Sequence, residues 1–289
     1  MTQFLNLLIN GLIEGLVVAL PALAMTLVMG VNRFPNAATG DLMTTGAYVA
    51  VAAQVMGLPS LALATIAGAA VTALVSAASY ELIFKKLARR AMIASLLASI
   101  GLGFFMRSVI SFFAGHDQRT FSVPLVRAWN FDGVRILPSD LTIAATALGC
   151  LLVVFFLLYK TSFGRQLRAV SDNPDLARAS GIRARGLMIG LWLLVGALSA
   201  VGGVLLGMKA VVQPDLGWDH LIPAFAAMVL GGIGSPVGAV IGALLMCVAQ
   251  ELSVPVLGPS YKLVLSFGVL ALVLLARPAG LMGRIELVR

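Results

Sequence analysis

Charged residues are scarce in this sequence. Only 11% of its 289 residues are Asp, Glu, Lys or Arg, whereas 60% are hydrophobic and the mean hydropathy is +1.01. Soluble domains carry about 25% charged residues, which they need to cover the surface of the fold. The shortage of charge therefore excludes one large soluble domain and indicates a protein whose surface faces lipid.

Residues that bind metals or form disulfides are nearly absent as well. The two cysteines, Cys150 and Cys247, both lie inside apolar blocks, where cysteine usually serves as a small packing residue. The two histidines, His116 and His220, are far apart in the sequence, and neither has a second histidine or a cysteine at metal-ligand spacing. We therefore expect no disulfide, no metal site and no cofactor in this chain.

The sequence also lacks a nucleotide-binding motif. Gly232-Ile233-Gly234 is followed by Ser235 and Pro236, so the third glycine of a dinucleotide fingerprint is misplaced, and no lysine follows that would complete a P-loop. No cluster of polar residues suited to catalysis is visible either. We expect this chain not to be an enzyme on its own.

Long apolar runs are what the sequence has instead. Leu141–Tyr159 and Leu187–Met208 each approach the ~20 residues that a helix needs to cross ~30 Å of hydrocarbon. Such runs predict an all-α, polytopic transmembrane bundle, with residues 1–289 as a single domain. The predicted membrane segments, about eight to nine with two short ones, are 8–31, 41–56, 61–82, 91–115, 140–160, 187–209, 219–232, 236–253 and 259–276.

The basic residues are unevenly distributed between the loops. With the loop 161–186 in the cytoplasm, fourteen of the twenty Lys and Arg residues fall inside and five fall outside, where 116–139 is the main loop. The positive-inside rule then places the N-terminus outside and the C-terminus inside. Glu14 and Arg107 lie near the outer ends of predicted spans, so we expect them to reach the interface by snorkelling.

Two parts of the chain share one pattern. Residues 8–82 and 187–253 both read as a long span, a short glycine-containing span and a long span, and the predicted topology gives them opposite orientations. Such a pattern is typical of an inverted repeat, in which short or interrupted helices meet at the transport pathway.

A glycine-rich stretch, MVLGGIGSPVGAVIGALLM, runs from Met228 to Met246. The break at Gly231-Gly232 predicts the end of one helix, and Pro236 suits the first turn of the next. Gly234, together with Gly238 and Gly242, follows a spacing of four that lets another backbone approach one helix face. Two interpretations stay open: a pure packing surface, or a hinge that lines a pathway.

The loop 161–186 contains a short predicted helix. Asn173 is a good N-cap, Pro174 suits the first helical position, and Asp175 lies at the positive end of the helix dipole. Gly181 predicts the end of the helix after about two turns. A helix this short is unstable alone in water, so we expect a partner surface to hold it, unless the segment is an ordinary surface loop.

Several stretches resemble one family, the LivH-type permeases of branched-chain amino acid ABC transporters. FGRQLRAVSDNPDLARASGI looks like the cytoplasmic loop of that family, AFAAMVLGGIGSPVGAVIGALL like its late glycine-rich segment, and RPAGLMGR like its C-terminal end. Asn36-Ala37-Ala38-Thr39-Gly40-Asp41 resembles a family stretch N-x-A-x-G-[DE]. The resemblance covers nearly the whole chain in order. Ala37 and Thr39 depart from it, because the family often has the larger Phe and His there.

The resemblance implies an import permease in a bacterial inner membrane. A second, related permease, two ABC ATPases and a periplasmic solute-binding protein would be its partners, with ATP and Mg²⁺ bound by the ATPases and alternating access as the mechanism. The residues that it implies for ATPase coupling are Arg165, Asp172, Asn173, Pro174, Asp175, Ala177 and Gly181. Those that we assign to a pathway or hinge are Asn36, Gly40, Asp41, Gly231, Gly232, Gly234 and Pro236.

The solute is left open by the sequence. Branched-chain or related amino acids are the first expectation, and a permease of the same family for urea or another small amide or acid is the alternative. A stand-alone secondary transporter is a further alternative, but the ionisable residues near the bilayer midplane that such proteins use for ion coupling are scarce here.

Overall fold

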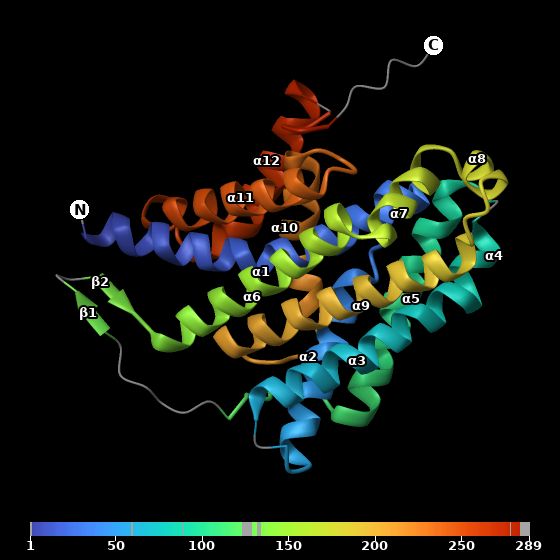
Figure 1. Ribbon diagram of the computed structural model, residues 1–289. Helices are drawn as coiled ribbons and strands as arrows, with labels where there is room; N and C mark the ends of the chain where they lie inside the picture. Colours follow the sequence, from blue (N-terminus) through green and yellow to red (C-terminus); the bar gives the residue numbers. More distant parts are fainter. Residues whose placement is uncertain are drawn as a thin grey trace.

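The computed structural model describes residues 2–58, 60–88, 90–122, 129–131, 134–277 and 279–283, and most of them are helical (Figure 1). An antiparallel hairpin precedes the sixth helix and consists of β1 (Trp129–Phe131) and β2 (Val134–Ile136). The helices are α1 (Thr2–Asn32), α2 (Thr39–Val55), α3 (Leu61–Ser79), the π-helical turn η1 (Tyr80–Phe84), α4 (Lys85–Leu87), α5 (Met92–Ala114), α6 (Pro138–Lys160), α7 (Ser162–Asp172), α8 (Pro174–Ala179), α9 (Ala184–Lys209), α10 (Leu216–Gly231), α11 (Pro236–Leu257), the 3-10 turn η2 (Pro259–Tyr261) and α12 (Lys262–Ala276).

Seven helical runs in the described part of the chain are long and apolar enough to cross a membrane. They are α1, Leu61–Leu87, α5, α6, α9, α11 and Pro259–Ala276, and α10 is a shorter apolar helix. The predicted polytopic bundle is therefore confirmed, and the chain is a multi-pass membrane protein. Two boundaries differ most: the span predicted as 8–31 begins already at Thr2, and the span predicted as 61–82 continues to Leu87, because the π-helical turn η1 widens the helix instead of ending it.

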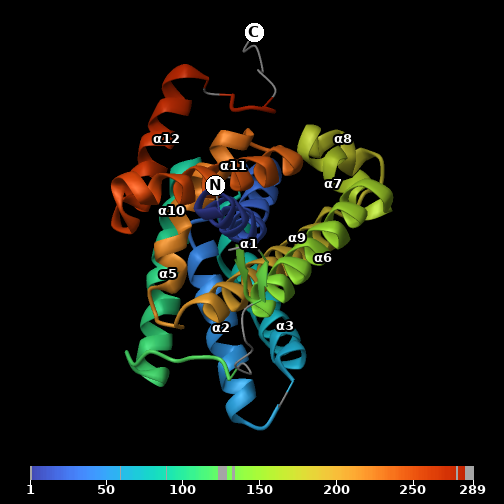
Figure 2. The same cartoon turned by 90° about the vertical axis from the view of Figure 1, so that its left-hand side faces the viewer.

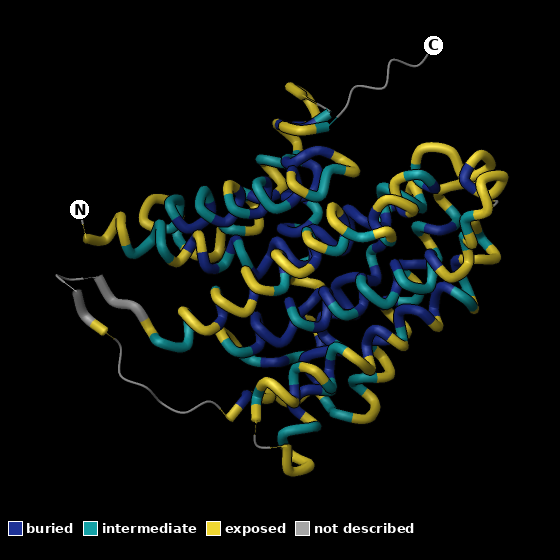
Figure 3. The backbone as a smooth tube through the Cα atoms, viewed as in Figure 1, coloured by how far each residue is buried: buried dark blue, intermediate teal, exposed yellow. Residues whose placement is uncertain are grey.

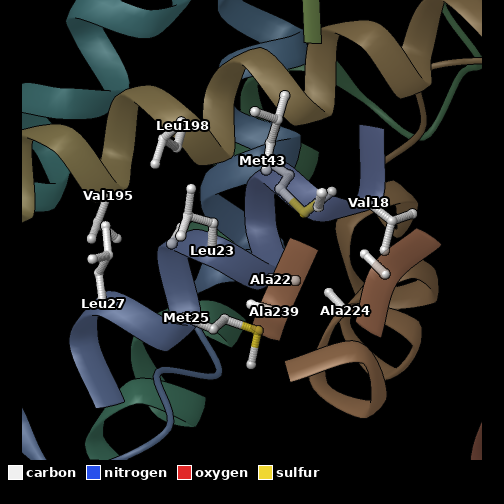
Figure 4. Close-up of a cluster of buried hydrophobic side chains, with 14 of the residues drawn as sticks. Val18, Ala22, Leu23, Met25, Leu27, Met43, Val195, Leu198, Ala224 and Ala239 are labelled. Carbon is white, nitrogen blue, oxygen red and sulfur yellow. The ribbon is translucent and has the colours of Figure 1, made fainter. Parts of the chain in front are cut away.

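Helices α1 and α9 form the centre of the bundle (Figure 3). Every residue of α1 from Val17 to Val28 is buried, which explains why this helix is apolar all round and not amphipathic. Its side chains meet Met43 of α2, Leu198 of α9 and Ala224 of α10 in one core (Figure 4). The apolar runs of the sequence are thus used for protein packing as well as for contact with lipid.

Helix α2 is enclosed by its neighbours along most of its 17 residues. A Cβ atom added to Gly46 would overlap Ala200 of α9, and one added to Gly203 of α9 would overlap the backbone of Met43. Small residues at such places let helix backbones approach closely inside a membrane protein. The predicted short segment 41–56 is therefore a helix packed inside the bundle.

The two ends of the bundle carry different structures. The N-terminus and the β1–β2 hairpin lie at one end, and α4, α7 and α8 lie at the other (Figure 1). At the hairpin end, the backbone of Arg119 pairs with that of Val212 through two hydrogen bonds of 2.9 and 2.7 Å. At the α8 end, the guanidinium of Arg185 pairs with the Glu81 carboxylate at 3.0 Å. The predicted loops 116–139 and 161–186 thus emerge at opposite ends, although residues 123–128 and 132–133 lie outside the described part of the chain.

One side of the bundle is formed by α5, α10 and α12 (Figure 2). Helix α5 buries only a narrow stripe and exposes large apolar side chains such as Phe105, Phe112 and Phe113. Helix α12 likewise exposes Leu272 and Leu275. These exposed rings and aliphatic chains are what lipid or a second membrane subunit would cover. The long–short–long order of α1–α3 and of α9–α11 is present, whereas the inverted repeat between them stays a prediction.

Candidate functional site

The segment α7–α8 is fixed to the rest of the bundle at several points. Helix α7 turns one face inward, with Gly164, Leu167 and Val170 buried at a spacing of three. The Ser171 hydroxyl donates a hydrogen bond of 2.6 Å to the carbonyl of Gly30 near the end of α1. On the α6 side, the Arg168 guanidinium donates one of 2.6 Å to a carbonyl of that helix. A displacement of α7 would therefore be transmitted directly to α1 and α6.

Helix α8 begins and ends as the sequence predicts. The Asn173 side-chain oxygen accepts hydrogen bonds from the backbone N–H groups of Asp175 at 3.1 Å and Leu176 at 3.0 Å, which is an N-cap. At the other end Gly181 has φ of +81° and its N–H bonds to the third residue before it, while the Ile182 N–H bonds to the Ala177 carbonyl. This pair of bonds is a Schellman motif, so the predicted two-turn helix is confirmed.

One predicted contact residue of α8 faces the wrong way. Ala177 is only 4% exposed and belongs to the buried core, so it cannot offer its side chain to a partner. It is Leu176 that points outward, with 64% of its surface exposed. The sequence alone did not distinguish these neighbours, because a six-residue helix is too short to show an apolar periodicity.

The other residues predicted for coupling lie on the exposed surface of the same segment. Arg165 and Asp172 of α7 are exposed, as are Asn173 and Pro174. Asp175 forms an ion pair with Arg178, one turn later on α8. Because both side chains of this pair are largely exposed, it contributes little to stability, and it remains available to a partner. The segment therefore presents an apolar side chain, Leu176, between charges of both signs.

The break predicted in the glycine-rich stretch is present between α10 and α11. Gly232 and Gly234 have φ of +112° and +81°, a region of backbone space that favours glycine. Ser235 caps α11 by accepting a hydrogen bond of 3.1 Å from the Gly238 N–H, and Pro236 occupies the first turn. Whether this break moves as a hinge stays a prediction.

The small face of α11 differs from the one predicted. Gly234 lies outside the helix and contributes nothing to this face. A Cβ on Gly238 would overlap the carbonyl of Gly231, and one on Gly242 would overlap that of Ala227. The prediction was wrong in this detail because helical spacing was carried back through a proline. The close approach itself is real, and it joins α10 to α11.

The stretch after α12 pairs with the end of α10. The N–H groups of Leu281 and Met282 donate hydrogen bonds of 2.9 Å each to the carbonyls of Leu230 and Gly231. Terminal carbonyls of a helix have no partner within the helix, so this backbone clamp satisfies them. The resemblance of RPAGLMGR to a family C-terminus thus marks a structural element, which we name the C-terminal clamp, residues 279–283.

The stretch from Asn36 to Asp41 builds the start of α2 in the centre of the protein. Asn36 is fully buried; its side-chain oxygen accepts from the Ala38 N–H at 3.2 Å, and its backbone carbonyl accepts from the Thr39 hydroxyl at 2.8 Å. Gly40 lies against Gly217 in the first turn of α10. The N-terminal ends of two short helices therefore meet, although the chain separates them widely.

A charge cluster lies beside this junction. The Arg107 guanidinium of α5 pairs with Asp41 at 2.9 Å and with Asp215, just before α10, at 3.2 Å. The same guanidinium lies over the rings of Trp218 at 4.9 Å and Phe104 at 5.4 Å. The snorkelling predicted for Arg107 is therefore wrong, because two carboxylates hold the side chain inward.

A second group of charges joins α1, α11 and α12. The Lys262 ammonium lies 3.5 Å from the Glu14 carboxylate and also pairs with Glu251. Beside it, the Gln250 amide donates to the Ser266 hydroxyl at 2.5 Å. Glu14 thus does not simply snorkel as predicted, because a lysine from α12 pairs with it in a partly buried position.

Sequence reasoning missed Arg107, Asp215 and Lys262 as site residues. A usable signal existed, because ionisable residues within membrane spans are rare and usually pair with one another or mark a functional site. What the sequence did not reveal was which charges meet. Gly103 gives a further hint in retrospect, since a Cβ there would overlap the Asp41 carboxylate.

The chain matches a family model described as the permease component of branched-chain amino acid transport systems, over residues 7–274. It is 32% identical to the high-affinity branched-chain amino acid transport system permease protein BraD of Pseudomonas aeruginosa, over 98% of this chain and 97% of that protein. To the corresponding protein LivH of Escherichia coli K12 it is 32% identical, over 98% of this chain and 96% of that protein.

Solved structures share the fold at low sequence identity. PsaBC from Streptococcus pneumoniae, in complex with Fab, matches with a TM-score of 0.52 and 14% identity over 96% of this chain and 93% of that one. A metal-chelate type ABC transporter in an inward-facing conformation matches with a TM-score of 0.50 and 19% identity, over 93% and 85% of the two chains. At these identities the likeness concerns the fold alone.

Proposed function

Since this chain belongs to the family of permease components of branched-chain amino acid transport systems, we propose that it is a membrane subunit of an ATP-driven importer for branched-chain or closely related amino acids. Membership of this family implies partners of the ABC transporter type. We further propose the composition of the complex: a second, related permease, two ATPase subunits and a periplasmic binding protein. ATP and Mg²⁺ would bind to the ATPases.

The observation that carries this proposal is the construction of the α7–α8 segment. An exposed Leu176 lies on a helix capped at both ends, at the end of the bundle opposite the N-terminus. That helix is attached to α7, and α7 is attached through Ser171 to the end of α1. Such an element suits docking to an ATPase, because a displacement of α8 would be transmitted through α7 to α1, the central helix of the bundle. We infer that the α8 end faces the cytoplasm of a bacterial cell.

The two departures from the family stretch do not argue for another solute. Thr39 is fully buried and its hydroxyl bonds within its own turn. Ala37 is half-buried, and its N–H donates to Ser99 of α5 at 3.1 Å. Both residues form hydrogen bonds that stabilise the start of α2. Branched-chain amino acids therefore remain the first proposal for the solute, with urea or another small amide or acid as the alternative.

The test is reconstitution of the full complex in lipid vesicles with its binding protein. We expect uptake of radiolabelled leucine, isoleucine or valine. This uptake should require ATP on the side of the vesicle membrane to which the ATPases are bound. Uptake of urea in preference to leucine would favour the alternative solute. Uptake that needs a proton or sodium gradient and no ATP would overturn the proposal in favour of a secondary transporter.

A further inference from the structure

The cluster around Arg107 has one enclosed and one open side. The Asp41 side chain is only 3% exposed and accepts from both Nε and Nη2 of Arg107, whereas the Asp215 side chain is 60% exposed. The rings of Trp218 and Phe104 flank the guanidinium and are 37% and 51% exposed. The open side thus presents a carboxylate, part of a guanidinium and two aromatic faces together.

The position of this open side is unusual for a membrane protein. Arg107 lies about 10 Å before the end of α5, on the side of the bundle made by α5, α10 and α12 (Figure 2). A charged side chain that faces hydrocarbon at depth costs roughly 2.5–3.5 kcal/mol on insertion scales. Asp215 lies in the connection between α9 and α10, and an aspartate as exposed as this one is stable only where water or polar groups face it. The open side of the cluster therefore faces water or polar groups, unlike the apolar surfaces of α5 and α12 around it.

We propose that Arg107 and Asp215, with the rings of Trp218 and Phe104, form a contact site for the zwitterionic head group of a free α-amino acid. The inference rests on the proposed function and adds the residues that meet the solute. A free amino acid carries a carboxylate and an ammonium on the same carbon atom. The carboxylate would pair with Arg107 and the ammonium with Asp215, replacing their mutual ion pair by two new ones.

The two aspartates have different parts in this site. Asp41 is a positioning residue: buried between α2 and α5, it holds the guanidinium through two hydrogen bonds to one carboxylate oxygen. Gly103 makes room for it, since a Cβ would meet the other oxygen. Arg107 thus keeps a counter-ion when Asp215 turns to a solute. The apolar side chain of a branched amino acid would lie against the rings of Trp218 and Phe104, which offer large apolar areas for contact.

The transport test compares Asp215→Asn with Asp117→Asn in the reconstituted complex. Asp117 is an exposed acid just after α5 and has no ion pair with Arg107, so the control removes the same charge from a neighbouring place. We expect Asp215→Asn to lower leucine uptake per ATP hydrolysed at least fivefold, Asp215→Glu to restore part of it, and Asp117→Asn to match the wild type. Equal ratios for Asp215→Asn and wild type would overturn the contact site, as would an equal loss in both Asn variants.

A labelling test addresses the access of water to the open side of the cluster independently of transport. In a complex free of Cys150 and Cys247, Asp215→Cys should react with a membrane-impermeant cationic thiosulfonate, whereas Leu148→Cys, exposed on α6, should not. Leucine-loaded binding protein should slow the labelling of Asp215→Cys. An unreactive Asp215→Cys overturns the inference. If the wild-type complex takes up no amino acid, the proposed function fails, and with it the solute named here; leucine uptake with unreactive Asp215→Cys overturns the contact site alone.

Discussion

Gly40 and Gly217 are in direct backbone contact, each in the first turn of its helix. A Cβ on Gly40 would lie 2.6 Å from the Gly217 carbonyl oxygen, and a Cβ on Gly217 would overlap the Gly40 carbonyl. The Thr44 hydroxyl fixes the contact further by accepting a hydrogen bond of 2.9 Å from the Gly217 N–H. Since 173 positions separate these two bonded residues in the chain, this contact joins the two halves of the protein.

We predict that Gly217→Ala prevents the close approach of α2 and α10. It should lower the free energy of unfolding by more than the roughly 1–3 kcal/mol that overpacking usually costs. The added Cβ would overlap the backbone carbonyl of Gly40, which cannot rotate away as a side chain could. The yield of monodisperse protein in detergent and its thermal unfolding midpoint measure the effect. Gly149→Ala is the matched control, because no atom lies within 4 Å of a Cβ there. A normal midpoint for Gly217→Ala would show that α2 and α10 do not meet as described.

The sequence predicts the helices of this protein well and their contacts poorly. Length and hydropathy suffice for spans because a helix must satisfy its own backbone in lipid. The contacts of Gly40 with Gly217 and of Arg107 with Asp41 depend on tertiary packing, which leaves no periodic signal. Local rules worked where the physics is local, as in the capping of α8 by Asn173. They failed for Ala177, whose burial depends on its neighbours.

The C-terminal clamp predicts different effects for two neighbouring glycines. A Cβ on Gly232 would overlap Gly283, and its φ of +112° is strained for any other residue, whereas Gly234 has φ of +81° and a Cβ there would lie at an ordinary contact distance, 3.9 Å, from the Cα atom of Gly30. Gly234→Ala should therefore cost about 1–2 kcal/mol of backbone strain, and Gly232→Ala clearly more. Thermal midpoints of both variants decide this. Equal losses would mean that residues 279–283 do not pack on α10.

Removing the lysine of the second charge group should leave two carboxylates unbalanced. Lys262→Met deprives Glu14 and Glu251 of their shared cation, and breaking a buried pair in this way typically costs about 3–5 kcal/mol. These side chains are only partly buried, so we expect the lower end of that range or less. The double variant Lys262→Met/Glu251→Gln should recover part of the loss in a thermal unfolding assay. A double variant no more stable than the single one would exclude the like-charge explanation.

The orientation of the chain is predicted by its basic residues and can be tested by labelling intact cells. In a chain without Cys150 and Cys247, Asp175→Cys on α8 should resist a membrane-impermeant thiol reagent, and Gln118→Cys at the other end should react. Both positions are exposed, so access alone decides the result. Permeabilised cells provide the control, in which both should react. Labelling of Asp175→Cys from outside would reverse the topology and remove α8 from the ATPase side.

The last prediction concerns the docking of α8 to an ATPase. Leu176 is the exposed apolar side chain of this helix, and burying a leucine contributes about 1.5–3 kcal/mol, or roughly a 10- to 100-fold change in affinity. Leu176→Arg should thus lower recovery of the ATPases with the permease and lower leucine uptake in proportion. Membrane insertion should stay normal, because the side chain touches little of its own chain.

Two further variants separate docking from folding. Ala177→Trp should disrupt the packing of α8 on the bundle, since Ala177 is 4% exposed, and should therefore lower the thermal midpoint of the isolated permease. Arg183→Ala, exposed just beyond the Schellman turn, changes a charge near the same surface and should retain most of the uptake. If Leu176→Arg binds the ATPases and transports leucine like the wild type, another surface of the protein receives the force of ATP hydrolysis.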